Sequence, residues 1–122
     1  MWTIHGSGGD IWNASDQFHF VWQSVSGDSS IVARLTSQQN TSICTKAGIM
    51  YRASTDPAGV NYSVVMLPDC HFSTSSVQVN ARGAMSATAT TANDTPTTLP
   101  VYLKATRTGN TTRSRPTHRA TA

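Results

Sequence analysis

The chain has 122 residues, a formal net charge of +3 and 12% charged residues, and it contains no glutamate. This length supports one modest core, and the charged fraction is about half the roughly 25% of ordinary soluble domains, which is typical of a secreted β protein. Three of the nine basic residues lie in residues 111–122 and the rest of the chain is formally neutral, so no basic stripe indicates a nucleic-acid partner. No apolar run is long enough to cross a membrane, and residues 1–5 lack the features of a signal peptide. If the domain is exported, we expect its export signal to lie upstream.

Two short strands are predicted near the N-terminus, over residues 2–5 and residues 17–23, because apolar and polar residues alternate in both. A glycine-rich turn separates them. In the second strand, alternation places three aromatic residues on one side, and we expect them to form the packing centre of the core: Phe18, Phe20 and Trp22.

The next predicted strands cover residues 30–39, 46–52 and 61–67, each bounded by turn signals. The turn at residues 26–28 predicts that the first of them forms a hairpin with the aromatic strand. A strong turn signal, Asp-Pro-Ala-Gly, precedes the strand at residues 61–67.

Further strands are predicted over residues 76–82 and 101–105, while residues 83–98 are at best weakly strand-like. Residues 111–122 carry no large apolar side chain, so we expect a disordered basic tail. Turn signals every 8 to 12 residues without a helical period predict an all-β fold, an antiparallel sandwich or jelly roll.

The most distinctive stretches are GSGGDIWNASDQFHFVWQ, SGDSSIVARLTSQQNT, KAGIMYRAS and PVYLKATRTGN. In wording, order and spacing they resemble the bacterial secreted concanavalin A-like domain described as "regulation of enolase protein 1". The resemblance implies a concanavalin A-like jelly roll over residues 1–110, and a lectin-like accessory module attached to an extracellular carbohydrate-active domain.

Three stretches depart from that family: Cys44 replaces an aromatic residue, residues 69–75 replace a Gly-rich turn, and residues 111–122 replace aromatic strands. The resemblance therefore implies a sandwich that is incomplete at its C-terminal end. An unpaired sheet edge would make the domain marginally stable or prone to association.

Catalytic chemistry is not indicated. A glycosidase needs two carboxyl groups across the scissile bond, whereas this chain has no Glu and its six Asp residues mostly lie in predicted turns. Zinc ligands would need paired spacing, which Cys44, Cys70 and His71 lack, and no loop signature supports calcium at the N-terminal Asp residues, so no cofactor is predicted. Cys44 and Cys70 either form one disulfide or remain two unpaired small residues.

A binding function is the stronger prediction. The sides of the strands opposite the apolar residues carry polar groups suited to hydrogen bonding with a polysaccharide: His19, Gln23, Arg34, Gln38, Lys46 and Arg52. Trp12 either stacks on a sugar or packs across the first turn, and a binding module should expose an aromatic residue, for which Trp12, Tyr62 and Tyr102 are the candidates. The sequence predicts a non-catalytic, secreted carbohydrate-binding module, with a structural spacer or adhesion sandwich as the alternative.

Overall fold

The computed structural model describes residues 1–70, 74–109 and 111–117, and within them it contains nine β-strands and no helix. The predicted all-β fold is confirmed, and every strand pair is antiparallel. No helix in the described part of the chain could therefore cross a membrane. The strands are β1 (Asp10–Trp12), β2 (Ser15–Gln17), β3 (Ser29–Leu35), β4 (Ala47–Arg52), β5 (Asn61–Leu67), β6 (Ser76–Arg82), β7 (Thr90–Pro96), β8 (Val101–Thr108) and β9 (Thr111–Thr117).

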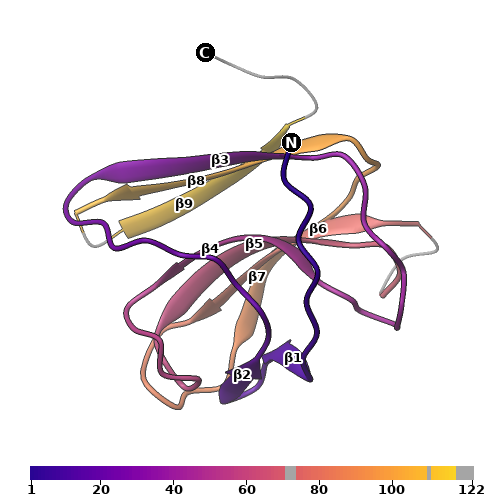
Figure 1. Cartoon of the computed structure of the whole chain (residues 1–122). Helices are drawn as coiled ribbons and strands as arrows, with labels where there is room; N and C mark the ends of the chain where they lie inside the picture. The colour runs from indigo at the N-terminus through magenta and orange to yellow at the C-terminus, as the bar shows by residue number, and fades with distance from the viewer. Residues whose placement is uncertain (71–73, 110, 118–122) are drawn as a thin grey trace.

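The strands form two layers and a small hairpin. One sheet has the order β3-β8-β9, the other has the order β4-β5-β6-β7, and β1 pairs only with β2 (Figure 1). The β1–β2 hairpin lies below the four-stranded sheet, on the side away from the three-stranded sheet (Figure 1). The four-stranded sheet is thus covered by the other sheet on one face and partly by the hairpin on the other.

The core lies between the two sheets. Alternate residues of β8, Val101, Leu103 and Ala105, point into it and are fully buried. The four-stranded sheet contributes Ile49, Val64, Met66 and Val77 to the same cluster. The alternation predicted for the β3, β4 and β6 regions therefore identifies the correct inward faces, because the core side of a sheet is lined by every second residue of each strand.

Both faces of β6 are buried. Its inward residues are Val77 and Val79, and its outward residues, Gln78, Asn80 and Arg82, are also at most 2% exposed. The outward face of β6 is therefore polar but is not a solvated surface.

The predicted aromatic strand is wrong. Only Ser15–Gln17 forms a strand there, and neither residues 2–5 nor residues 18–23 are strand residues. Phe20 and Trp22 are 36% and 61% exposed, so these aromatic residues are not the packing centre of the core. The predicted hairpin is also absent, because β3 pairs with β8. Alternation shows that a segment can be a strand, but a strand also needs a backbone partner.

Two later segments are more ordered than predicted. Residues 83–98, expected to be at best weakly strand-like, contain β7, which pairs with β6. The expected tail disorder is wrong for Thr111–Thr117, which form β9 along β8, while residues 118–122 lie outside the described residues. Neighbouring strands supply hydrogen-bond partners that sequence composition does not reveal.

Candidate functional site

The contact between the β1–β2 hairpin and the four-stranded sheet is built around Asp16, a buried residue of β2. Arg82 of β6 binds both of its carboxylate oxygens, with Nη2 2.7 Å from Oδ1 and Nη1 2.8 Å from Oδ2. Arg52 of β4 donates from Nη1 to Oδ2 at 2.6 Å, and Asn61 of β5 donates from Nδ2 to the same oxygen at 3.3 Å. One carboxylate therefore ties the hairpin to three strands.

Arg82 uses its remaining donors on backbone carbonyl groups. Nη2 donates to the oxygens of Trp12 and Asn13 at 3.1 and 3.0 Å, and Nη1 donates to that of Gly59 at 3.2 Å. Nε donates to Ala87 O at 3.0 Å. The Arg82 and Asp16 side chains have no exposed surface, so this pair joins the hairpin to the surrounding turns and offers nothing to a ligand.

The charges of this cluster shift one another's titration. Burial alone would raise the pKa of Asp16, but hydrogen bonds from Arg82 and Arg52, with the positive charges of both, hold it below its usual value. The hydrogen bond to Asp16 raises the pKa of Arg82 above its usual value, against the opposing effect of burial. Asp16 and Arg82 are therefore both charged at neutral pH.

Three of the predicted binding residues lie together at this contact. Lys46 Nζ is 2.6 Å from Asp10 Oδ1 and 5.9 Å from the centroid of the Trp12 ring, and Arg52 binds Asp16. The Lys46 and Arg52 side chains are 7% and 8% exposed. Both cations and Trp12 hold the hairpin against β4, so the structure corrects the prediction that these two cations lie on an open hydrogen-bonding surface.

The other predicted binding residues are scattered. Arg34 is exposed on β3, in the other sheet, with its guanidinium carbon 5.8 Å from the centroid of the Tyr102 ring. Gln38 donates from Nε2 to Thr45 O at 3.2 Å in the connection between β3 and β4. His19 and Gln23 are exposed in the connection between β2 and β3. The seven predicted residues therefore do not share one polar face.

The polar residues on the outer face of the four-stranded sheet bind one another. Thr91 Oγ1 donates to Asn80 Oδ1 at 2.9 Å, Asn80 Nδ2 to Gln78 Oε1 at 3.3 Å, and Gln78 Nε2 to Asp94 Oδ2 at 3.0 Å. Because Gln78 and Asn80 are each 2% exposed, this network links β6 to β7 inside the protein. It is a structural network and not an accessible site.

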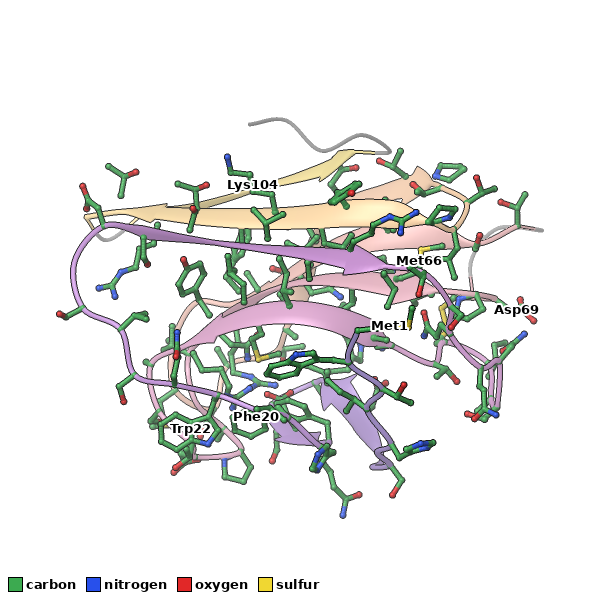
Figure 2. The ribbon with its side chains drawn as sticks, turned by 45° about the horizontal axis from the view of Figure 1, so that its top comes forward. Met1, Phe20, Trp22, Met66, Asp69 and Lys104 are labelled. Carbon is green, nitrogen blue, oxygen red and sulfur yellow. A yellow bond between two sulfur atoms is a disulfide. The ribbon has the colours of Figure 1, made fainter. Side chains whose placement is uncertain are left out.

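Several exposed large side chains belong to residues 18–25, which we call the aromatic segment. Phe18 is anchored: the Arg52 guanidinium carbon lies 5.4 Å from its ring centroid, and the Phe20 ring stacks on it at 4.9 Å between centroids. Phe20 is partly exposed and Trp22 more so, and Figure 2 shows both below β4. The aromatic segment therefore begins with a packed ring, Phe18, and continues with two exposed rings, Phe20 and Trp22.

The N-terminal arm, residues 1–9, lies beside the start of this segment. A Cβ at Gly8 would collide with the backbone carbonyl of Gln17, and one at Gly6 would lie 2.7 Å from the His19 Cβ. Trp2 is 79% exposed on this arm. Glycine at both positions permits the close approach, because any larger residue would push the arm away.

Cys44 and Cys70 form a disulfide, which decides between the two states left open by the sequence. Cys44 N also donates to Asp69 O at 2.6 Å, so this bridge joins the connection before β4 to the chain that follows β5. Within the described ranges no three His, Cys, Asp or Glu side chains gather as metal ligands, and His71 lies outside those ranges.

Comparison with family models, with curated proteins and with solved structures finds no match. The resemblance to a concanavalin A-like domain therefore stays a prediction, as does the jelly-roll connectivity.

Proposed function

We propose that this chain is a non-catalytic extracellular accessory module that binds carbohydrate through its aromatic segment. The observation that carries the proposal is the 61% exposure of Trp22 next to the partly exposed Phe20, on a segment whose inner end is anchored. Exposed indole and phenyl faces lose unfavourable contact with water when they pack against the C–H surfaces of a sugar ring. An exposed aromatic residue is also the feature by which a binding module differs from a spacer.

The surroundings of Trp22 suit a sugar. His19 and Gln23 are exposed in the same segment and can exchange hydrogen bonds with hydroxyl groups, which fix the orientation of a ligand held by stacking. Arg52 is 8% exposed and bound to Asp16, so its role is to position the Phe18 ring, not to contact the ligand. The site consists of Trp22, Phe20, His19 and Gln23.

The extracellular and accessory parts of the proposal have separate support. A disulfide such as Cys44–Cys70 persists in oxidising compartments, and the low charge with no Glu is typical of secreted β domains. The resemblance to secreted concanavalin A-like domains supports attachment to a carbohydrate-active domain. The same lack of Glu supports a binding function over hydrolysis.

Affinity gel electrophoresis against soluble glucans, mannans, xylans and bacterial polysaccharides tests the proposal. We expect at least one polysaccharide to retard the native chain, and Trp22→Ala to weaken that interaction about tenfold or more, equivalent to ~1.4 kcal/mol. Val32→Ala, which alters another exposed apolar residue on β3, is the matched control and should behave like the native chain.

Two results would contradict the proposal in different ways. If no polysaccharide retards the native chain, the spacer or adhesion function replaces the binding function. If a polysaccharide retards the native chain and Trp22→Ala equally, the chain binds carbohydrate at another surface.

A further inference from the structure

The aromatic segment has the alternating sequence of a β-strand, but no neighbouring strand pairs with it. Its residues alternate between aromatic and other side chains, yet none lies in a strand, and in the described part of the chain its backbone forms no hydrogen bond with another backbone group. All of its residues except Phe18 are exposed. Exposed, unpaired N–H and C=O groups on an extended segment can pair with another strand, as occurs in β-strand addition.

The segment also lacks the features that normally prevent such pairing. No charged residue or proline occurs between Asp16 and Asp28. The strands at the sheet edges all carry at least one: β3 has Arg34, β4 has Arg52, β7 has Asp94 and Pro96, and β9 has two arginines and Pro116. Charges and prolines protect sheet edges against association, so the aromatic segment lacks the protection that these edge strands have.

We propose that the aromatic segments of two copies of this chain pair as antiparallel strands about a twofold axis at Val21. This register places Phe20 opposite Trp22 of the partner subunit, and Trp22 opposite Phe20 of the partner subunit. On the other face, His19 lies opposite Gln23 of the partner subunit. Aromatic cross-strand pairs stabilise antiparallel strands, and no pair in this register brings two like charges together.

The sequence around Val21 is nearly symmetrical, which favours a second copy over an unrelated peptide. An aromatic residue lies on each side of Val21 and a polar residue at the next position on each side, so a twofold axis there brings similar side chains together. A ribbon of about seven residues per copy buries less area than a stable dimer interface, so the dimer is weak and depends on protein concentration. This inference does not rest on carbohydrate binding, because the strands pair through their backbone groups. The Phe20 and Trp22 side chains of both copies lie together on one face of the ribbon.

Cysteine crosslinking tests the register. Both native cysteines are in the disulfide, so Val21→Cys introduces a single free thiol. On the twofold axis the two Cα atoms of residue 21 would lie about 4.5–5.5 Å apart, within the range that a disulfide spans. Val25→Cys is the matched control, since Val21 and Val25 are both exposed valines on the same segment, 63% and 46% exposed. In this register two copies of residue 25 lie about 27 Å apart, from eight residues at roughly 3.4 Å each.

Under mild oxidation, Val21→Cys should give at least about fivefold more covalent dimer than Val25→Cys on a non-reducing gel, because only the first pair lies within disulfide reach. Sedimentation velocity of the native chain should show a monomer–dimer equilibrium between about 10 μM and about 1 mM, and Val21→Lys should remove it by placing like charges opposite each other. Circular dichroism checks that each variant is folded. Equal crosslinking of the two cysteine variants would overturn the register, and a monomer throughout that concentration range would overturn the dimer.

Discussion

At Asp16 a single carboxylate pairs with two arginines, which makes it the most sensitive residue of the hairpin contact. Asp16→Asn keeps the shape of the side chain but leaves Arg82 buried without a negative partner. Breaking a buried ion pair in this way costs about 3–5 kcal/mol of the free energy of unfolding. Urea denaturation measures the loss.

Asp10→Asn is the matched control. Asp10 lies in the same hairpin as Asp16 and forms an ion pair with Lys46, but the Asp10 side chain is 45% exposed. Pairs that retain this much contact with water contribute about 1 kcal/mol or less. Equal losses in the two variants would show that the Asp16 cluster is no more important than a surface pair.

The lowered pKa of Asp16 predicts how stability depends on pH. A carboxyl group whose pKa is lower in the folded state stabilises the fold fully above its unfolded value, 3.8, and this contribution is lost as the pH falls through the folded value. The free energy of unfolding should therefore decrease as the pH is lowered below about 4. Urea denaturation at a series of pH values measures this, and Asp16→Asn should show a smaller decrease. An unchanged pH dependence in the variant would assign the acid sensitivity to other carboxyl groups.

Glycine is required at position 48 because the backbone of the neighbouring strand β5 leaves no room for a side chain, and not because of the backbone angles of Gly48. A Cβ at this position in β4 would collide with the carbonyl oxygen of Val64 in β5. Gly48→Ala should therefore force the two strands apart and cost about 1–3 kcal/mol or more in thermal or urea unfolding. Gly83→Ala is the control, because a Cβ there meets no atom within 4 Å, and we expect a change of no more than about 1 kcal/mol. Similar losses in both variants would contradict this packing argument.

At the scale of elements, the Cys44–Cys70 disulfide joins two connections at the same end of the four-stranded sheet. Its cysteines are separated by 26 positions, and cross-linking a loop of that length is expected to contribute roughly 3 kcal/mol by restricting the unfolded chain. Melting with and without dithiothreitol should show a lower Tm for the reduced protein. The double variant Cys44→Ala and Cys70→Ala should melt near the reduced protein and be insensitive to dithiothreitol. A reductant effect that persists in the double variant would exclude the disulfide as its cause.

The sequence predicts elements best where alternation and pairing agree. Strand β6, whose apolar residues alternate, and strand β5, which has four apolar residues in a row, both begin and end at the predicted residues. Their apolar side chains are buried, and each strand has a neighbour on both edges. The aromatic segment has equally clear alternation but no partner, and β7 has little alternation but pairs with β6. Pairing between distant segments therefore decides these two cases, and a local pattern does not contain that information.

The hairpin contact shows the same limit for individual residues. Asp16 and Arg82 are 66 positions apart, and each has an ordinary local explanation, as a turn residue and as a polar strand end. The sequence places Arg82 on the same side of its strand as Gln78 and Asn80, and the structure shows that this side is buried, so the guanidinium needs an anionic or carbonyl partner. The identity of that partner depends on how the hairpin folds back, which the sequence pattern does not specify.

At the scale of the whole molecule, the two sheets and the hairpin are connected in series. The three-stranded sheet packs on the four-stranded sheet through the core, and Asp16 and Arg82 hold the hairpin to the other side of the four-stranded sheet. Loss of packing in the three-stranded sheet should therefore destabilise the β1–β2 hairpin, although the hairpin lies on the opposite face of the four-stranded sheet. Trp12 reports on the hairpin because it is half-buried beside Lys46, whereas Trp2 and Trp22 are exposed and should change less on unfolding.

Leu103→Ala tests this cooperativity. Leu103 is fully buried in β8 and packs in the core between the sheets, so its truncation should cost about 2–5 kcal/mol. If the layers unfold together, urea curves from tryptophan fluorescence and from far-UV circular dichroism should shift to lower urea by the same amount and remain superimposable. Val32→Ala, on the exposed side of neighbouring β3, should change the free energy of unfolding obtained from either curve by no more than about 0.5 kcal/mol. A fluorescence curve that stays in place while the circular dichroism curve shifts would show that the hairpin unfolds independently of the sandwich.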